Sequence, residues 1–465
     1  MSTTTSIVSA DLSRAPQWGV LFAVGVGTFV SAMGGSAVYT VLPVVARAFG
    51  ADVAAIEWVL TVYLLVVSTM LLSFGRLGDL HGHRRVYISG FFVLLSASAL
   101  CGLAPTPTML IAARAAQALG AAMVFSNGPA ILTRSFSASQ RGRALGMQAA
   151  MTYLGLTAGP SLGGWVAALW SWRAVFFLNL PVGLVAVALS LRFIPDDVPT
   201  EKHESFDLIG GALFPLGLGV LLVALNRGHD WGWRSADTLT TFVIAIVLLT
   251  AFVIVERCVR APMLDLELFR HRTFSGAAAS AVLNYICVNS VVFLLPFYLM
   301  DGRGLGPAHA GLVLTTQPIV MAVVAPVSGA LSDRIGSRAL ATVGMTVLAV
   351  GLFVLSRLGP ASPMPLVTLG LIVTGLGTGI FGSPNNNSLM GAAPRHRQGI
   401  AGGVLASARN TGMALGVGLA AAVVTTVLVH APVGGPVSPI FHATARAFLV
   451  ATGVALLGVI TSTVR

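Results

Sequence analysis

The sequence predicts an all-α protein that crosses a lipid bilayer many times. Hydrophobic residues make up 55% of the chain and charged residues only 9%, whereas a soluble domain carries about 25% charged residues. The charges are also clumped, so that long uncharged stretches alternate with short polar connections. Because water is absent from the bilayer core, each such stretch must satisfy its own backbone groups, and we expect it to be helical.

The uncharged stretches give fourteen expected transmembrane helices. A spanning helix needs roughly 20 predominantly apolar residues. Trimmed at their Gly- and Pro-rich ends, the stretches place helices at residues 17–42, 57–75, 86–104, 108–132, 143–168, 174–194, 208–226, 238–256, 275–300, 308–332, 339–357, 365–391, 400–428 and 444–464. The longest polar connections, 195–207 and 257–272, are too short to bury a core of their own. We therefore expect no soluble domain.

The basic residues predict the orientation of the chain. A net charge of +11 would suggest nucleic-acid binding in a soluble protein, but in a membrane protein it marks the cytoplasmic loops. With the N-terminus in the cytoplasm, 18 Lys and Arg residues fall on that side and 7 on the outer side. We expect a multi-pass protein of a bacterial-type inner membrane with both termini cytoplasmic and no nucleic-acid partner. The three scattered cysteines suggest neither a disulfide framework nor a metal site.

An internal repeat divides the chain. Residues 75–82 read Gly-Arg-Leu-Gly-Asp-Leu-His-Gly after the second expected helix, and residues 329–336 read Gly-Ala-Leu-Ser-Asp-Arg-Ile-Gly after the tenth. Matching positions predict two six-helix bundles, at residues 1–194 and 273–465, with two inserted helices and their linkers at residues 195–272. Parallel six-helix repeats of this kind define a large class of secondary transporters.

With this repeat, the sequence resembles the major facilitator superfamily, and more narrowly its fourteen-helix drug:proton antiporter branch, from about Trp18 to about Ala422. The resemblance implies a secondary transporter that exports drugs, antibiotics or secondary metabolites by alternating access, with protons as the coupling ion. We expect it to function as a monomer. The chain has no G-x-x-x-x-G-K-[ST] loop, so any uphill transport must use an ion gradient. No cofactor is implied.

The repeated octets resemble the cytoplasmic gate of this family. Asp79 stands near a helix end and close to several arginines, and such a cluster can pin two helix ends together in one state and release them in the other. The alternative is that these charges only fix the topology. The expected gate residues are Gly75, Leu77, Asp79, Gly82, Arg84, Arg85, Asp333, Arg334 and Arg338.

Spaced small residues on the fifth expected helix resemble the antiporter motif of the family. Glycines let a neighbouring helix approach closely, and proline permits a kink, so ordinary helix packing is the alternative. The motif residues are Gly146, Gly155, Gly159, Pro160, Gly163 and Gly164. The same stretch fits the G-x-S-x-G pattern of hydrolases, but Ser161 lies in a long apolar helix where no histidine base is expected. We expect no enzyme.

Two arginines are the only charges expected deep in the membrane. Arg114 resembles part of the family's helix-four motif and by that resemblance would assist proton movement; the alternative is an arginine that snorkels to the outer surface. Arg409 lies on the thirteenth expected helix. The residues expected to line a substrate cavity, or else to bond between helices, are Tyr39, Gln117, Gln317, Asn385, Asn386, Arg409 and Asn410.

An absence separates this chain from the family pattern. Gly34 stands where the family usually has an aspartate that is thought to take part in proton coupling and cation binding. All 16 acidic residues fall in loops, in the N-terminal tail or at helix ends. A cavity with arginines and without a carboxylate should repel permanent cations and accept anions or neutral amphiphiles.

Glu57 and Asp301, at the outer ends of expected helices, are the remaining candidates for reversible protonation. A partly desolvated carboxyl group binds protons near neutral pH, while an exposed acid that caps a helix start is the alternative. A facilitator, or an exporter of one anionic or neutral metabolite with weak or no proton coupling, therefore stays open as a second hypothesis. In both cases a small molecule and the lipid bilayer are the expected partners.

Overall fold

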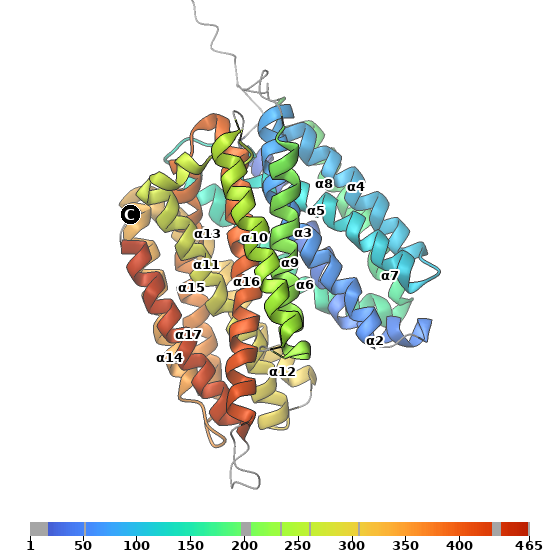
Figure 1. Ribbon diagram of the computed structural model, residues 1–465, viewed down its shortest axis with the longest axis vertical. Coiled ribbons are helices and arrows are strands. Elements are labelled where there is room, and N and C mark those ends of the chain that lie inside the picture. Colours follow the sequence, from blue (N-terminus) through green and yellow to red (C-terminus); the bar gives the residue numbers. More distant parts are fainter. Residues whose placement is uncertain are drawn as a thin grey trace, which may run out of the picture.

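The computed structural model describes residues 17–50, 53–196, 206–232, 235–259, 262–305, 307–429 and 439–463. Every regular element within these ranges is helical, and most helices run along the long axis of the molecule (Figure 1). Twelve helices in the described part of the chain are long and apolar enough to cross a membrane. The expected all-α polytopic fold is thus confirmed.

The first helices in the chain form what we name the N-terminal group. Its members are α1 Gln17–Ser36, α2 Val38–Phe49, α3 Val53–His81, α4 His83–Leu103, α5 Pro107–Ser135, α6 Arg141–Leu169, α7 Trp172–Phe177 and α8 Asn179–Phe193. Within it, α5 packs against α3 and α4, and α1 packs against α6 and α8. These helices are blue to cyan in Figure 1.

The last helices form the C-terminal group. Its members are η1 Leu266–Arg270, α11 Arg272–Pro296, the π-helix η2 Phe297–Gly302, α12 Pro307–Leu314, α13 Thr316–Ile335, α14 Ser337–Ser356, α15 Met364–Ala392, η3 Arg395–Arg397, α16 Gln398–Val429 and α17 Pro439–Thr463. Here α14 packs between α15 and α17, and α11 packs against α16 and α17. Figure 1 shows these helices in yellow-green to red.

Two helices stand between the groups in sequence and lie at the seam between them in space. They are α9 Leu208–Trp231 and α10 Ala236–Cys258. They pack on each other, and α9 also contacts α3 of one group and α16 of the other. Apart from this pair, the groups meet where α6 packs against α13 and α16 packs against α3 and α5.

Two of the expected helices are interrupted because of proline. The sixth breaks at Leu178 and the tenth at Thr315, and a proline stands three residues after each break, Pro181 and Pro318 respectively. Proline supplies no N–H for the bond to the preceding turn. The first expected helix also breaks, at Ala37, and its second part, α2, then runs to Phe49.

The repeated octets are helical, which corrects the expectation that the second helix ends at residue 75 and the tenth at residue 332. α3 continues to His81 and α13 to Ile335, and only the final glycine of each octet leaves the helix. Gly82 has φ 96° and Gly336 has φ 89°, values that L side chains rarely adopt. In the first octet, other helices bury the two charged residues Arg76 and Asp79, with 0% and 1% exposure, although hydropathy alone would end the helix before them.

Candidate functional site

The first octet joins the two helix groups through Asp79. The backbone N–H groups of Gly399 and Ile400, in the first turn of α16, donate to the two carboxylate oxygens of Asp79 at 2.9 Å each. The N-terminus of a helix carries unpaired N–H groups and partial positive charge, so a carboxylate there is stabilised. Asp79 of the N-terminal group therefore caps a helix of the C-terminal group.

The second octet makes the reciprocal connection. The N–H groups of Gly142 and Arg143, in the first turn of α6, donate to the two oxygens of Asp333 at 2.8 and 2.9 Å. Asp333 of the C-terminal group thus caps a helix of the N-terminal group, as Asp79 does in the other direction. We name these two capped contacts the gate, after the role expected for the two octets.

Glycines let the backbones meet at the gate. A methyl group on Gly399 would overlap the carbonyl oxygen of Gly75, and one on Gly329 would overlap the carbonyl oxygen of Gly142. The hydroxyl of Ser383 on α15 also donates to the Gly142 carbonyl at 2.8 Å. The first glycine of each octet is therefore in direct backbone contact with the opposite group, so the two groups touch at this end of the molecule.

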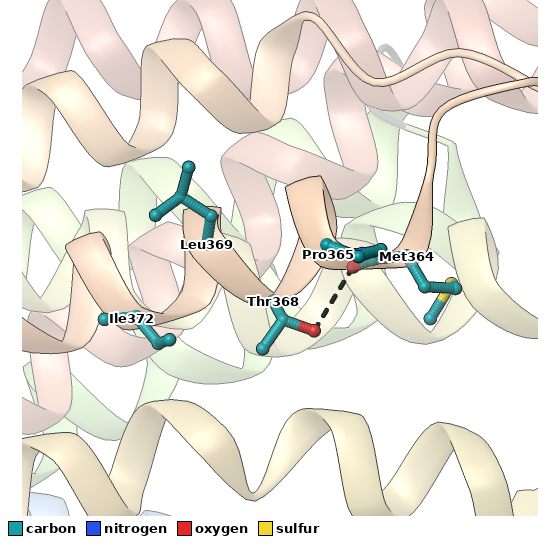
Figure 2. Close-up of a pocket in the computed structure, with 5 residues that line it drawn as sticks. All are labelled: Met364, Pro365, Thr368, Leu369 and Ile372. Atoms are coloured by element: carbon teal, nitrogen blue, oxygen red, sulfur yellow. Dashed lines mark hydrogen bonds between the residues drawn. The ribbon is translucent and has the colours of Figure 1, made fainter.

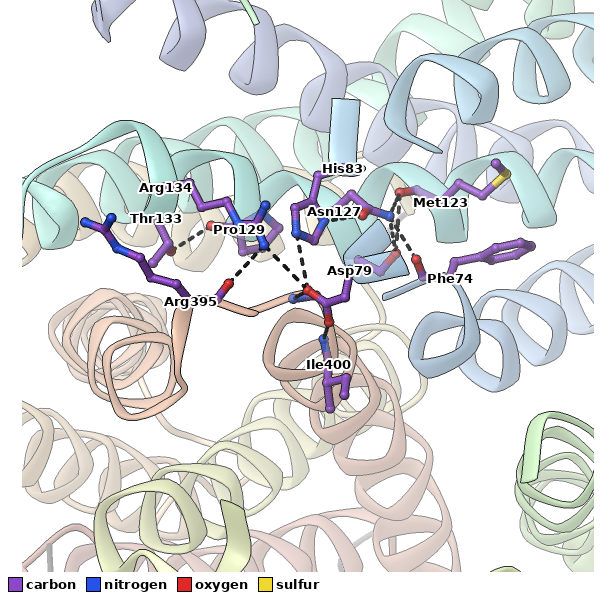
Figure 3. A network of polar contacts seen from close by, with 12 residues as sticks. Phe74, Asp79, His83, Met123, Asn127, Pro129, Thr133, Arg134, Arg395 and Ile400 are labelled. Carbon is purple, nitrogen blue, oxygen red and sulfur yellow. Dashed lines mark hydrogen bonds and ion pairs between the residues drawn. The ribbon is translucent and has the colours of Figure 1, made fainter. Parts of the chain in front are cut away.

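A buried polar network supports Asp79 (Figure 3). His83 lies 3.4 Å from the Asp79 carboxylate through Nε2, and its Nδ1 lies 2.8 Å from the side-chain oxygen of Asn127. Asn127 in turn donates to the carbonyl of Phe74 at 3.1 Å. Arg134 approaches Asp79 at 3.9 Å and donates to the Arg395 carbonyl at 2.9 Å.

The other expected gate residues lie around these contacts. Arg84 pairs with Asp196 and donates to the Leu191 carbonyl at 3.0 Å, which ties α4 to the end of α8. Arg338 donates to the Thr463 carbonyl at the end of α17. The remaining expected gate side chains are exposed or partly exposed, and they are Leu77, Arg85 and Arg334, while Gly82 and Gly336 end the octets.

The expected antiporter glycines pack against two different partners. Added methyl groups on Gly155, Gly159 and Gly163 would meet the backbone of the first helix, whereas one on Gly146 would meet the Ala325 carbonyl of α13 at 2.5 Å. Pro160 lies inside α6, and its carbonyl accepts from Thr40 at 3.2 Å. Gly164 is only loosely packed, since a methyl group there would lie 4.0 Å from Thr40. Small residues therefore bring α6 close to both groups.

Arg114 is fully buried and is held by dipoles. Its Nε donates to the Val59 carbonyl at 3.2 Å, and its Nη1 donates to the Gly34 carbonyl at 3.3 Å and to Gln117 Oε1 at 2.7 Å. Its guanidinium carbon lies 4.2 Å from the ring centroid of Tyr63. Nη2 has no hydrogen-bond partner, and no carboxylate in the described part of the chain pairs with this arginine. It does not snorkel to a surface.

An amide occupies the space beside Gly34. A Cβ on Gly34 would lie 2.9 Å from Asn179 Oδ1 and 3.1 Å from its Nδ2. Asn179 donates to Ser98 Oγ at 3.1 Å, and Gln117 donates to the same hydroxyl at 2.9 Å. We name Arg114, Gln117, Ser98 and Asn179 the Arg114 cluster. It places amides and a hydroxyl around the position where the family pattern has an acid.

A second cluster lies between the groups around Arg409 of α16. Its guanidinium carbon is 5.0 Å from the ring centroid of Phe125 on α5. It interacts electrostatically with Tyr63, Tyr153 and Tyr285, and the last two share a side-chain hydrogen bond. Tyr63 therefore interacts with both arginines, Arg114 of the N-terminal group and Arg409 of the C-terminal group.

The remaining residues expected to line a cavity differ in burial and in hydrogen bonding. Asn385 is fully buried and donates to the Ala277 carbonyl at 3.1 Å, which is the interhelical role. Gln317 is buried with an unpaired Nε2, and Asn410 has an unpaired Nδ2. Tyr39 is 50% exposed, and Asn386 is partly exposed. The side chains of Glu57 and Asp301 lie outside the described residues.

A hollow on α15 includes none of the residues of these clusters. It is lined by Met364, Pro365, Thr368, Leu369 and Ile372, all from the first turns of one helix (Figure 2). The single polar side chain, Thr368, donates to the Met364 carbonyl at 3.2 Å. This hollow offers no free polar group, and we assign it no role. Within the described residues no group of acids, histidines and cysteines is arranged to hold a metal ion.

Known proteins agree with this architecture. The sequence profile of the Major Facilitator Superfamily matches residues 24–417 and, in a second match, residues 277–464. The chain belongs to this superfamily. It is 34% identical over 400 residues to the riboflavin transporter RibZ of Clostridioides difficile (strain 630), with 86% of each chain covered. It is therefore a membrane transporter and not an enzyme.

Other relatives carry export in their names. The chain is 34% identical to the multidrug resistance protein Stp of Mycobacterium tuberculosis (strain CDC 1551 / Oshkosh), covering 85% of this chain and 74% of that one. It is 29% identical to the tetracenomycin C resistance and export protein of Streptomyces glaucescens, covering 87% and 75%. The human organic anion transporter MFSD10 has the same fold, with a TM-score of 0.69, 15% identity and coverage of 96% and 99%.

Sequence reasoning missed the partners of the expected residues. Gly399 and Ile400 bind Asp79 through backbone atoms, which carry no sequence signature. One signal was present: Gly142 and Gly146 at the start of α6 recur as Gly399 and Gly403 at the start of α16. Asn179 and Ser98 were missed because neither an amide nor a hydroxyl in an apolar helix is distinctive by itself.

Proposed function

We propose that this transporter exports small organic molecules by proton-driven alternating access, and that the molecules are anionic or neutral amphiphiles. The observation that carries the proposal is Arg114, fully buried with an unpaired N–H and no carboxylate partner among the described residues. A buried cation held only by dipoles is costly, and an anionic or strongly polar substrate would stabilise it. Names of relatives, which include multidrug resistance and export proteins, support export.

In this proposal fourteen helices cross the membrane. Twelve meet the length and hydropathy required of a span, and the two others in the proposal are α6 and α16, with 29 and 32 residues. Both pack along several of the twelve. Residues 1–194 and 273–465 then form the two six-helix bundles, and α9 and α10 are the inserted pair at residues 195–272.

We orient the gate toward the cytoplasm of a bacterial inner membrane, with both termini on that side and a monomer as the working unit. The start of α1 and the end of α17 both lie at the gate end of the molecule, which supports this orientation. The guanidinium carbon of Arg143 lies 4.8 Å from the ring centroid of Trp18 in α1. The carbonyl of Thr463 in α17 accepts a hydrogen bond from Arg338. The first and last described helices thus share one end of the molecule. Glu57 and Asp301 remain proposed sites of reversible protonation.

The test is transport by the purified protein in lipid vesicles. Anionic, neutral and permanently cationic compounds are offered with and without an imposed pH gradient. We expect accumulation of anionic or neutral compounds that depends on the gradient, and little movement of quaternary ammonium dyes. Efflux of such dyes at the rate of a dedicated pump would contradict the charge argument.

A second candidate is a facilitator, or an exporter of one anionic or neutral metabolite with weak or no proton coupling. It is favoured by the missing acid at Gly34 and by the relative named as a riboflavin transporter. Counterflow of labelled substrate separates the two candidates. Exchange that persists at full rate after collapse of the pH gradient, without uphill accumulation in its presence, would favour the facilitator.

A further inference from the structure

The inserted helices carry two buried acids that neither the gate nor the Arg114 cluster uses. Asp207 caps α9, where its Oδ1 accepts from the backbone N–H groups of Ile209 and Gly210 at 3.0 Å each. Glu256 lies in the last turn of α10, and its Oε2 accepts from the N–H of Leu264 at 3.0 Å. The two acidic residues are 8% and 4% exposed.

The remaining oxygens of the two acids border one small space over Gly210. A methyl group on Gly210 would overlap both Asp207 Oδ2 and Glu256 Oε1. Neither of these oxygens has a hydrogen-bond partner. Two buried carboxylates at such close range repel each other when both are ionised, and each leaves a desolvated acceptor without a donor. One proton removes the repulsion and turns one acid into a donor toward the other.

We propose that Asp207 and Glu256 form a proton-binding site that holds one proton between them while the gate is closed. Among the described residues, Arg76 of α3 is fully buried and interacts electrostatically with Glu256. In the segment after α10, Asp265 faces Arg397 instead, at 3.7 Å. The charged residues Asp237 and Arg257 of α10 itself are exposed.

The segment that follows α10 connects this site to both sides of the gate. Glu256 is anchored to Leu264, and the neighbouring Met263 is buried with its sulfur 3.6 Å from the Ser73 hydroxyl of α3. Asp265 then pairs with Arg397, which comes two residues before the N–H group of Gly399 that binds Asp79. Separating α3 from α16 at the gate therefore pulls on the backbone that holds Glu256.

Proton binding and gate position are consequently linked. The protonated pair is compatible with the closed arrangement, and loss of the proton restores the repulsion between the carboxylates and favours opening. This deepens the proposed proton-coupled export, and rests on it for the direction of proton flow, but occupancy of the pair by a proton can be measured without any transport.

Infrared difference spectroscopy of the purified full-length protein between acidic and alkaline buffer tests the site. We expect a band from a protonated carboxyl group in wild type that disappears in both Glu256→Gln and Asp207→Asn, and that shifts in Glu256→Asp. Asp237→Asn, which neutralises an exposed acid on the same helix, keeps the band. Circular dichroism confirms that each variant is folded. Persistence of the band in both neutral variants would overturn the proposal.

A distance measurement tests the link to the gate. Spin labels on Cys residues introduced at the exposed Ser139 and Ala339, in a Cys258→Ser background, report the separation of the two groups at this end. We expect the fraction of molecules with a closed gate to fall as pH rises in wild type and in Asp237→Asn. In Glu256→Gln, the change of this fraction with pH should be several-fold smaller than in wild type. Glu256→Gln with the pH response of wild type would refute the link. An intact band in a protein that shows no proton-coupled transport would refute the proposed function instead and leave the site standing.

Discussion

Arg114 illustrates how a single buried cation can be kept without a counter-ion. Two backbone carbonyls, one amide oxygen and the face of Tyr63 surround it. Each hydrogen bond to a charged group contributes about 1.5–3 kcal/mol, and the aromatic face adds about 0.5–2 kcal/mol. The donors point in three directions from one planar group, a geometry that only arginine provides.

Arg114→Lys should therefore impair transport although it keeps the charge. A single ammonium cannot reach Val59, Gly34 and Gln117 together, so at least one acceptor is left buried and unpaired. Loss of about 1.5–3 kcal/mol corresponds to a decrease of roughly tenfold or more in transport of an anionic substrate. Initial rates in vesicles measure this, with Arg257→Lys, an exposed residue, as the control. Wild-type rates in Arg114→Lys would remove this arginine from the transport path.

Gly34→Asp should confer transport of a permanent cation only when Asn179 is replaced by a smaller residue. A Cβ at residue 34 already comes within 2.9 Å of Asn179 Oδ1, so an aspartate there collides with the amide. Adding Asn179→Ala makes room and places a carboxylate beside Arg114. We expect the double variant, and not Asn179→Ala alone, to gain transport of a quaternary ammonium dye in vesicles. No gain in a folded double variant would show that the missing acid does not set the charge selectivity.

At the scale of helices, the gate is built from two reciprocal caps. Each carboxylate accepts two N–H groups from the first turn of a helix in the opposite group. Charge at a helix N-terminus contributes about 0.3–1 kcal/mol when exposed and up to about 2 kcal/mol when partly buried. In the proposed alternating-access cycle, an interaction of this size would favour the closed state and still allow the groups to separate.

Asp79→Asn and Asp333→Asn should each open the gate. The amide keeps one acceptor but loses the charge, and its NH₂ group faces an N–H donor. A loss of about 1–2 kcal/mol lowers the ratio of closed to open molecules about 5–30-fold. The spin-label pair at residues 139 and 339 measures that ratio. If only one of the two variants shifts the ratio, the caps are not equivalent.

Gly399→Ala should also prevent closure, for a steric reason. Its methyl group would overlap the carbonyl oxygen of Gly75, and a backbone atom cannot rotate away. Gly453 of α17 has nothing within 4 Å of the same position, so Gly453→Ala serves as the control. We expect the first variant to shift the gate toward open and the second to leave it unchanged. A closed gate in Gly399→Ala would mean that the helices can part slightly without opening.

The sequence predicted the positions of the helices, but it did not predict some helix ends or the partners of several polar residues, for physical reasons. Stretches with at most one charge located all the long helices, because charge that faces lipid and unpaired backbone groups are both costly in the bilayer. Helix ends were set too early at residues 75 and 332, since hydropathy reports lipid contact and not the continuation of a helix whose polar residues pack against other helices. Asp79 and Asp333 were expected, but their partners are N–H groups and have no residue preference. Asn179 became visible only when α8 was packed against α1.

At the scale of the molecule, two groups of helices meet along a seam that α9 and α10 cover from one side. Contacts across the seam come mainly from α6 against α13 and α15, and from α16 against α3 and α5. Both α6 and α16 begin at the gate and carry glycines against their neighbours. Of the fourteen proposed transmembrane helices, α6 and α16 are the two that do not reach, within the described residues, the mean hydropathy used to recognise a membrane span. This agrees with helices that contact protein more than lipid.

The count of fourteen predicts that α6 crosses the bilayer. Cys residues introduced at Ser139, before α6, and at the exposed Trp170, after it, should then react with a membrane-impermeant thiol reagent from opposite faces. We expect Ser139→Cys to react from the cytoplasmic face, which inverted vesicles expose, and Trp170→Cys from the outer face. Labelling is done in the Cys258→Ser background. Reaction of both from one face would reduce the number of crossings.

The donors that grip Asp79 and Asp333 belong to the peptide backbone, which every residue except proline supplies. Substitution of Asp79 or Asp333 therefore weakens these hydrogen bonds directly. Substitution of the residues that donate the N–H groups leaves the donors in place, because the donors are not side chains. Revertants of a damaged acid should arise at distant positions that stiffen or loosen the bundles, and not at residues 399, 400, 142 or 143. Each of the two contacts therefore joins a carboxylate, which mutation can change, to backbone N–H groups, which mutation hardly changes, and the two contacts run in opposite directions between the helix groups.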